Sequence, residues 1–475
     1  MKKIKIITAM LLVSMAAGVI SACNDTTDGT TVTSGNETEA TAASTVPKES
    51  DKANESTAAT KEATGTSSYI ELKAQKVTDE GEDGSLLVWG WNKEGVNLIE
   101  KYSDVTFKKQ ISSGAAAYPG LLDRALASGD NAPDVFFFGP ESAKRYLNSD
   151  DVLPLNNLGI SYDEFMDQSF DFVVRTGTDR DGIVKGLSWQ ACPCCVIYNK
   201  AVAREVLGVE EPEEVAPFFK DWDTFLDTAR KVEKVSNGDV KIISGTDDVW
   251  RFFLNSRSKG WIVDNELNID PVMEEYMNFA KILSGEKLTF GTTQGSAAWS
   301  KNMTNHKVLA YFGSLQTVKY SMGFADGSNK TSGEWGIVEA PASSYLGGTW
   351  IAATKYCDMK ASAARIIRDL CINENNLTDM ARSGEFVNNK KVMMGMAQDP
   401  VFAFECLGGQ NPVPLLINAA NALDLSTVQE NDEYINNAWC SAVTAYCDGR
   451  VDSVAKAEAA FKAAVEDLGI LTPAE

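Results

Sequence analysis

The chain has 475 residues, which is long for one ordinary domain and favours two globular lobes. Hydrophobic residues make up 44% of the sequence, enough to bury a sizeable core, and the formal net charge is −22. This acidity argues against nucleic-acid partners and polyanionic ligands, because the summed field would repel them, and it fits a neutral or cationic ligand better.

Residues 1–22 have the pattern of a lipoprotein signal peptide. Three lysines precede an apolar run over 6–20, which is too short to prefer spanning a membrane. The run ends in Ile20-Ser21-Ala22-Cys23, which resembles a bacterial lipobox, whose cysteine is diacylated and becomes the mature N-terminus. We therefore expect Cys23 to be lipidated and to anchor the protein to the outer face of the cell membrane. An ordinary cleaved signal peptide with a cysteine at this place is the alternative.

Residues 23–83 are expected to form a disordered tether. The stretch 24–68 is rich in Thr, Ser, Ala and Glu and contains no aromatic residue. Such a segment cannot bury enough apolar surface to offset its ordering entropy. A tether of this length is more typical of a wall-exposed Gram-positive lipoprotein than of a periplasmic one.

The first globular elements follow a β-α-β pattern, which indicates an α/β fold. Residues 85–89 and 134–138 are short apolar runs bounded by polar or turn residues, as in the buried strands of a parallel sheet. Between them, 118–128 carries apolar residues at helical spacing. Helices are expected to dominate the rest of the chain, at 223–235, 271–283, 360–372, 432–447 and 451–468.

Several motifs occur in a fixed order along the globular part. The stretch 125–155 joins a Gly-containing turn, Pro-Asp-Val, a strand and Leu-Pro-Leu, and 182–207 is similar to a "Gly-Leu-Pro-Trp … Tyr-Asn-Lys" segment. Trp222-Asp223-Thr224-Phe225 is similar to a helix start, and KVLAYFGS (307–314) and GGTWI (347–351) match two turns. Together these segments resemble the extracellular solute-binding proteins, family 1 type, of carbohydrate ABC transporters. Ser188 departs from the usual proline, and Cys-Pro-Cys-Cys interrupts a strand.

The resemblance implies an α/β, two-lobe, periplasmic-binding-protein-like fold whose lobes are joined by hinge strands. The expected first lobe holds 84–190 plus 341–387, and the second holds 191–340 plus 388–475. A sugar would bind between the lobes, and hinge closure would present the closed form to the permease subunits of the transporter. That function needs no enzymatic chemistry, cofactor, metal or nucleic acid, and the protein is expected to be a monomer.

The candidate ligand contacts follow from the chemistry of sugars, whose C–H faces stack on aromatic rings and whose hydroxyls need planar polar partners. Residues of both kinds fall at the ends of the expected elements, where open α/β sheets bind ligands. The candidates are Trp91, Asn92, Phe138, Glu141, Ser142, Trp189, Gln190, Asp247, Asp248, Phe312, Ser314, Trp350, Gln410 and Asn411.

Each candidate has a plain structural alternative. Trp350 follows Gly347-Gly348, whose missing side chains would let a ligand approach, but it can equally pack under the hinge. Trp91 can belong to the core, and Glu141 can cap a helix. Asp247 and Asp248 can bind hydroxyls or cap the next helix.

Of the eight cysteines besides Cys23, the cluster Cys192, Cys194 and Cys195 is expected to consist of small buried residues on a strand, with a disulfide or a metal as alternatives. The domain is large enough not to need disulfides, and the cluster 192–195 lacks the usual zinc spacing. The single histidine, His306, also leaves little for a metal site or a Ser-His-Asp triad. The eight are Cys192, Cys194, Cys195, Cys357, Cys371, Cys406, Cys440 and Cys447.

Two other functions remain open at this point. A lipid-anchored glycoside hydrolase would use paired carboxylates, for which Glu141 with Asp247 or Asp248 are available. A binding protein for another small solute, such as a peptide, a polyamine or a metal ion, would keep the fold and change the ligand. The identity of the sugar does not follow from the sequence.

Overall fold

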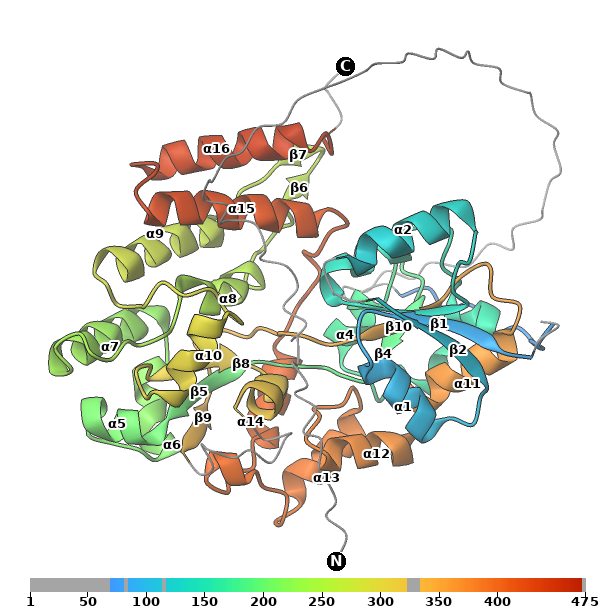
Figure 1. Cartoon of the computed structure of the whole chain (residues 1–475), viewed down its shortest axis with the longest axis horizontal. Coiled ribbons are helices and arrows are strands. Elements are labelled where there is room, and N and C mark those ends of the chain that lie inside the picture. Colours follow the sequence, from blue (N-terminus) through green and yellow to red (C-terminus); the bar gives the residue numbers. More distant parts are fainter. Residues whose placement is uncertain (1–68, 81–83, 113–116, 323–333, 472–475) are drawn as a thin grey trace, which may run out of the picture.

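A computed structural model describes residues 69–80, 84–112, 117–322 and 334–471 of the chain. The signal peptide and Cys23 lie outside the described residues. The described chain forms two α/β lobes, with strands and loops crossing between them (Figure 1). Within these ranges no helix is both long and apolar enough to cross a bilayer.

Lobe 1 is built on a five-stranded sheet in the order β2-β1-β3-β10-β4. Strand β1 pairs in parallel with β2 and β3, and β10 pairs antiparallel with β3 and β4. The predicted strands at 85–89 and 134–138 are confirmed to within a residue. The bounds are β1 Leu86–Gly90, β2 Phe107–Ile111, β3 Val135–Phe138, β4 Gly186–Ser188 and β10 Trp350–Ala353.

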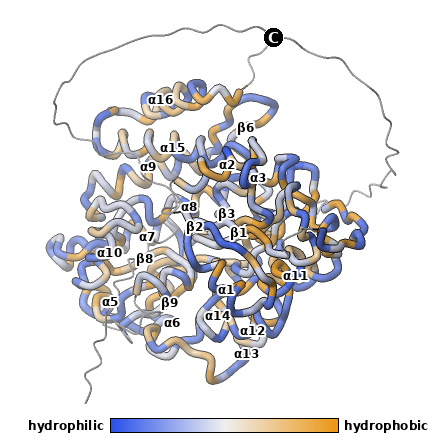
Figure 2. Tube along the Cα trace, turned by 45° about the vertical axis from the view of Figure 1, so that its right-hand side comes forward, coloured by the Kyte–Doolittle hydropathy of each residue, from blue (hydrophilic) through white to orange (hydrophobic). Residues whose placement is uncertain are grey.

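The strands of this sheet differ in burial according to their place in it. The central strand β3, with the sequence VFFF, is buried along its whole length. The edge strand β2 exposes Lys108 and Lys109, and its trace is hydrophilic in Figure 2. Charged side chains on an edge strand discourage pairing with another chain.

Helices and short 3-10 turns surround the lobe 1 sheet. The predicted helix at 118–128 is confirmed, and it ends at Gly129, whose φ of 75° allows its N–H to bond to Ala125 O. The helices are α1 Glu94–Tyr102, α2 Tyr118–Ser128, α3 Ala143–Leu147, α4 Asp171–Thr176 and α11 Lys360–Cys371. The 3-10 turns are η1 Pro140–Ser142, η2 Leu155–Leu158 and η3 Tyr162–Glu164.

Lobe 2 contains a smaller antiparallel sheet in the order β8-β5-β9. Its strands are β5 Cys195–Asn199, β8 Ala310–Gly313 and β9 Trp335–Val338. Because side chains alternate along a strand, β5 serves two cores. Cys195 and Ile197 join the core that continues into lobe 1, whereas Val196 and Tyr198 join the core of lobe 2.

Most of lobe 2 is helical, as the sequence predicted. Asp221 caps α7, since its carboxylate accepts a hydrogen bond from Thr224 N at 2.7 Å. The longer helices are α5 Lys200–Leu207, α7 Trp222–Val235, α9 Pro271–Gly285, α10 Ala297–Thr304, α15 Asp432–Cys447 and α16 Val454–Asp467. The shorter elements are α6 Pro212–Val215, η4 Ala216–Phe219, η5 Thr246–Asp248, α8 Trp250–Leu254, β6 Ile262–Val263, β7 Glu266–Leu267 and the π-helix η6 Thr317–Ser321.

Three helices lead from lobe 1 to the lobe 2 sheet (Figure 1): α12 Glu374–Arg382, α13 Lys390–Gln398 and α14 Val413–Asn421. The turn η7 Glu405–Leu407 lies between the last two and contacts β9. Their apolar residues, Met393 and Leu416 among them, belong to the core that continues through lobe 1. The sequence assigned 388–475 to lobe 2, but α13 and α14 form a bridge between the lobes.

Two segments that cross between the lobes run antiparallel to each other. Cys194 N donates to Ser344 O at 2.8 Å, and Leu346 N donates to Cys192 O at 3.1 Å. A third segment joins them, because Ala191 N donates to Phe386 O at 3.0 Å. The crossing segments 189–195, 344–346 and 385–389 therefore fix the place where the lobes meet.

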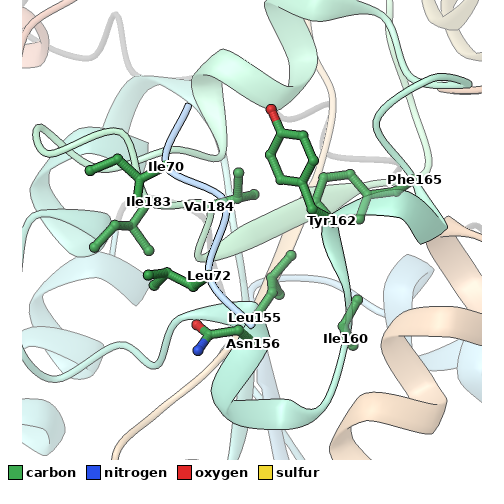
Figure 3. A pocket seen from close by; sticks show the side chains of 9 residues that line it. All are labelled: Ile70, Leu72, Leu155, Asn156, Ile160, Tyr162, Phe165, Ile183 and Val184. Carbon is green, nitrogen blue, oxygen red and sulfur yellow. The ribbon is translucent and has the colours of Figure 1, made fainter. Parts of the chain in front are cut away.

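The stretch 69–80 lies against lobe 1. Ile70 N donates to Gly182 O at 2.8 Å, and Gln75 N donates to Asn156 O at 2.8 Å. Ile70 also lines a cavity of about 20 Å³ beneath the stretch, which holds no more than about one water (Figure 3). The sequence assigned 69–80 to the tether, but these backbone hydrogen bonds make the stretch part of lobe 1.

The eight cysteines of the described ranges are free thiols. Cys192, Cys194 and Cys195 are buried, as expected for small core residues. Burial raises the pKa of the Cys195 thiol to about 12, so this group stays protonated at neutral pH.

Candidate functional site

The first of two polar clusters at the junction of the lobes surrounds the crossing segments. We call it the hinge cluster: Glu94, Gln190 and Glu385 from lobe 1, with Lys319 and Tyr320 from lobe 2. Glu94 begins α1, directly after β1, so it stands at the carboxyl end of a central strand. Gln190 lies two residues beyond β4, and Lys319 and Tyr320 lie on η6, which follows β8. The topology thus brings five residues from four distant segments together.

The amide of Gln190 ties the hinge cluster together. Its Nε2 donates to Glu94 Oε1 at 3.2 Å and to Glu385 Oε2 at 3.1 Å. Tyr320 OH lies 3.3 Å from Glu94 Oε1 and 3.4 Å from Glu385 Oε1. Lys319 Nζ forms an ion pair with Glu385 Oε1. Two carboxylates therefore share an amide and a hydroxyl, and one of them is paired with an ammonium group.

Glu94 is the unusual acid of this cluster. Burial first, and the neighbouring Glu385 carboxylate second, raise its pKa to about 7, against the opposite effect of Lys319, Tyr320 and Gln190. A carboxyl group with this pKa changes its charge near neutral pH. The hinge cluster can therefore take up or release a proton under ordinary conditions.

Two predicted residues lie beside the hinge cluster in the chain. The Trp91 ring is partly exposed and packs 5.8 Å from the Tyr118 ring. Asn92 Oδ1 accepts a hydrogen bond from Glu94 N at 2.9 Å, which helps to fix the start of α1. Trp91 is therefore partly exposed three residues before Glu94 in the chain.

The second cluster also spans the two lobes, and we call it the arginine cluster. Its members are Glu141 and Arg145 from lobe 1, and Asp247, Arg251 and Glu433 from lobe 2. Arg251 Nη2 lies 3.4 Å from Glu141 Oε1, and Arg145 Nη2 lies 3.9 Å from Glu433 Oε2. These distances are long for hydrogen-bonded ion pairs.

Several buried atoms of the arginine cluster lack hydrogen-bond partners within the described part of the chain: Arg145 Nε, Asp247 Oδ1, Arg251 Nε and Glu433 Oε2. Buried polar atoms are normally paired, so such a group is typical of a place that water or a ligand completes. Asp247 Oδ2 does accept a bond from Gln294 N at 2.7 Å, and burial raises the Asp247 pKa to about 6.

Tyr345 adds an aromatic ring to the arginine cluster. It lies on the crossing segment 344–346, is partly exposed, and packs 5.8 Å from the Phe172 ring. Burial raises its pKa first, and the nearby Glu141 carboxylate raises it second. The cluster therefore combines planar charged groups with an aromatic side chain.

Asp248 has a different role from its neighbour Asp247. It is 3% exposed, and its carboxylate accepts bonds from Trp299 Nε1 at 2.6 Å, Ser244 N at 3.1 Å and Gly245 N at 3.0 Å. Burial and the Asp247 carboxylate raise its pKa to about 8. Asp248 holds the turn that begins η5. It does not cap the next helix, α8, which has no side-chain cap, so the capping role suggested by the sequence is not observed.

Trp350 lies inside the lobe 1 sheet and is 0% exposed. Its Nε1 donates to Val173 O at 3.1 Å. Gly348 has a φ of 104°, and a Cβ there would lie 2.9 Å from the Trp350 ring. The glycine makes room for this ring, where the sequence suggested room for a ligand. Because β10 is paired on both edges, Trp350 packs as a core residue.

Other candidates also pack inside the lobes. Phe138, Trp189, Phe312 and Ser314 are each 1% exposed or less, and Ser142 is 9% exposed. Ser314 Oγ donates to Leu346 O at 3.0 Å, so it supports a crossing segment. Each of these residues lies in a buried strand or a few residues after one, and its side chain is packed inside the lobe.

Gln410 and Asn411 hold backbone groups. Gln410 bonds to both backbone groups of Ile337, accepting at 2.9 Å and donating at 3.0 Å. Asn411 Nδ2 donates to Met396 O at 2.9 Å. The sequence offered both amides as ligand contacts, but their partners are backbone groups of the protein.

Of the predicted residues, Gln190 lies in the hinge cluster, and Glu141 and Asp247 lie in the arginine cluster. The sequence reasoning did not select Glu94, Lys319, Tyr320, Glu385 or Arg251 as site residues. Two signals were present: Glu94 opens the helix after β1, and Arg251 lies one helical turn beyond Asp247. Nothing in the spacing marked Lys319 or Glu385.

The family of bacterial extracellular solute-binding proteins matches residues 98–400 of the chain. A comparison with curated proteins finds no match by sequence.

Solved structures share the fold at low sequence identity. A protein described as extracellular solute-binding protein family 1 has a TM-score of 0.69 and 16% identity, over 80% of this chain and 98% of that chain. A B. animalis subsp. lactis ABC transporter binding protein in complex with β-1,6-galactobiose gives 0.63 and 18%, over 81% and 97%. The galacto-N-biose-/lacto-N-biose I-binding protein of Bifidobacterium longum gives 0.60 and 14%, over 82% and 98%.

Proposed function

The chain belongs to the family of bacterial extracellular solute-binding proteins, and we propose that it captures a carbohydrate outside the cell and delivers it to an ABC importer. The observation that carries the proposal is the arginine cluster, where planar polar groups from both lobes meet with unsatisfied atoms. Such groups suit the hydroxyl rim of a sugar, and Trp91 and Tyr345 supply rings for its C–H faces.

The similar structures support this ligand class. The B. animalis protein was solved with β-1,6-galactobiose and the B. longum protein with lacto-N-biose. Binding between the lobes would draw Glu141 and Arg251 onto the same ligand, which couples capture to closure. The family is one of transport proteins rather than enzymes, so the sugar leaves the protein unchanged.

The protein is further proposed to be held at the outer face of the membrane by a lipid on Cys23. Replacing Cys23 by Ala should leave unprocessed precursor, or a protein that no longer fractionates with membranes. Mass spectrometry of the wild-type protein should find the acyl groups on Cys23. A mature protein that begins elsewhere and lacks acyl mass contradicts the anchor.

The ligand class is tested by a thermal-shift screen over mono- and oligosaccharides, peptides and polyamines, followed by calorimetry on the hits. A ligand that binds only the folded state at one hundred times its Kd stabilises it by about 2.7 kcal/mol. The Arg251→Gln variant should weaken binding of the best sugar, while Arg230→Gln, an exposed site remote from both clusters, serves as the matched control. Binding of a peptide or polyamine but of no sugar contradicts the proposal. Recovery of a cleaved oligosaccharide would instead support the hydrolase.

A further inference from the structure

The hinge cluster carries more acid than base. Glu94 and Glu385 contribute two carboxylates, and among the residues that the structure describes Lys319 is the one cation whose charge acts on Glu94. Lys319 is bonded to Glu385, so Glu94 has no cation of its own. A carboxylate enclosed by protein is unfavourable without a counter-charge.

The neutral members of the cluster do not remove this imbalance. Gln190 gives one N–H to each carboxylate, and the single hydroxyl proton of Tyr320 serves only one of them. Hydrogen bonds of this kind orient the two acids but add no positive charge.

A second, independent feature indicates a missing donor. Gln190 is 0% exposed, and its Oε1 is a buried atom for which the described part of the chain provides no hydrogen-bond partner. The amide orientation is fixed by the two acids, because the reverse orientation would set Oε1 against both carboxylates. An unpaired acceptor therefore adjoins a carboxylate that lacks a counter-ion.

We propose that the hinge cluster receives the ammonium group of an amino sugar, with Glu94 and Gln190 Oε1 as its acceptors. This inference rests on the proposed carbohydrate-binding function and narrows its ligand class. An ammonium group brings one positive charge and three N–H donors, so it meets both deficits at once. A neutral hydroxyl brings one donor and no charge, and an acidic sugar would add a third anion. Glu94, Lys319 and Tyr320 are partly exposed, so the cluster is reached from solvent.

In the ligand-free protein a proton takes the place of the ammonium group. Burial and Glu385 raise the pKa of Glu94 to about 7, and the groups that face it are Glu385, Lys319, Tyr320 and the Cys192 thiol. Arrival of the ammonium group favours the ionised carboxylate, so Glu94 releases a proton to solvent as the cation binds. Charge is conserved, because one cation enters and one proton leaves.

The experiment compares sugars that differ only in the group at C2. Calorimetry measures binding of glucose and glucosamine, galactose and galactosamine, and cellobiose and its fully deacetylated chitobiose counterpart, to the folded full-length protein. For at least one pair we expect the amino member to bind about 10- to 100-fold more tightly, the range for hydrogen bonds to a charged partner. Repeating the titration at pH 7 in two buffers of different ionisation enthalpy should show net proton release for the amino member only.

The variant Glu94→Gln keeps the shape of the side chain and removes its charge. It should bring the amino and neutral members of a pair to similar affinities and abolish the proton release. Glu100→Gln lies on the exposed side of the same helix and is the matched control, which should behave as the wild type. If Glu94→Gln does not fold, proton release by the wild type decides the question alone.

The outcomes separate the two proposals. Tighter or equal binding of the neutral sugars, without proton release, overturns the amino-sugar inference and leaves the carbohydrate function standing. If no sugar of either kind binds, while a peptide or polyamine does, both proposals fall.

Discussion

The hinge cluster and the arginine cluster both join the lobes, but they differ in how completely their atoms are bonded. In the hinge cluster one amide bridges two acids within 3.2 Å, and the ammonium of Lys319 is paired. In the arginine cluster the two interlobe ion pairs measure 3.4 and 3.9 Å, and several buried atoms have no partner in the described ranges. The first cluster is nearly complete and short of one positive charge, whereas the second is short of hydrogen bonds.

This difference suggests a division of labour in ligand recognition. A charge deficit selects a ligand by its charge, and unpaired planar groups select it by the arrangement of its hydroxyls. Both clusters rest on the same sheet, because β3 leads to Glu141 and β4 leads to Gln190, with β10 paired between them. Changes in β10 should therefore lower the stability of the sheet that carries both clusters, whereas changes within one cluster should affect ligand recognition by that cluster alone.

The largest expected effect is on stability and comes from the shared strand. Trp350→Ala should lower the free energy of unfolding by about 3–5 kcal/mol, because it removes a fully buried ring that β10 carries into the core of lobe 1. The affinity of the protein that remains folded should barely change. Melting temperature and ligand affinity measured on the same variant test this.

Trp350→Phe is the matched control. It retains most of the bulk of the side chain and removes the indole hydrogen bond to Val173 O. Loss of this hydrogen bond should lower the stability by about 1 kcal/mol, in addition to the effect of the smaller ring volume. A large loss of affinity with an unchanged melting temperature would show that Trp350 contacts the ligand after all.

Trp350 also shows which structural features a local sequence pattern can predict and which it cannot. The apolar run 134–138 predicted strand β3, because burial and strand length are local properties. The Gly347-Gly348 pair was expected to leave room for a ligand, but the two glycines instead adopt φ values of 91° and 104° beside other parts of the protein. The space is filled by protein atoms, since a Cβ at 347 would lie 2.2 Å from Gln316 Oε1.

The candidate site was predictable only in part for the same reason. Glu141, Asp247 and Gln190 stand at element ends, which a sequence reveals. Their partners Arg251 and Glu385 come from segments that meet only when two lobes assemble, and no spacing rule links them. The bridge formed by α13 and α14 was missed because the stretch 388–475 was assigned as a whole to lobe 2, and neither of these two helices was predicted.

The next largest effect concerns the pH dependence of stability and tests the charge deficit of the hinge cluster. The pKa of the Glu94 carboxyl group is about 7 in the folded protein, whereas the ordinary pKa of a glutamate is 4.5. Between pH 4.5 and pH 7 the folded state binds more protons at Glu94 than the unfolded state does. The stabilisation that comes from protonated Glu94 is therefore fully present below pH 4.5 and is lost as the pH rises through 7.

Glu94→Gln should therefore be more stable than the wild type at pH 8. The pKa difference sets an upper limit of about 3 kcal/mol for this gain, and the actual gain should be smaller because water reaches part of the Glu94 side chain. At pH 4 the two should be nearly equal. Denaturant unfolding at both pH values measures the difference. A difference that does not change with pH would mean that Glu94 has an ordinary pKa and that the cluster has no charge deficit.

The arginine cluster is tested through affinity. Arg251→Ala should weaken binding of the natural solute by about 1.5–3 kcal/mol, because it removes charged hydrogen bonds to the ligand and the pairing of Glu141. Arg251→Lys keeps the charge but loses the planar guanidinium fork, so it should recover only part of the affinity. Full recovery by lysine would show that charge, rather than geometry, is what this cluster supplies.

The smallest effect is expected at an exposed contact between the lobes. Arg180 Nη2 bonds to Glu430 Oε2 at 2.8 Å, and both side chains are well exposed, at 60% and 41%. Arg180→Gln should therefore change stability and affinity by less than about 1 kcal/mol, and 0.5 M salt should remove most of that difference, since exposed pairs are weak and screened. Asn148 also donates to Glu430 Oε2 at 3.0 Å and keeps it partly bonded in the variant. A tenfold change in affinity that survives high salt would show that this pair holds the lobes together, and that closure depends on more than the two clusters.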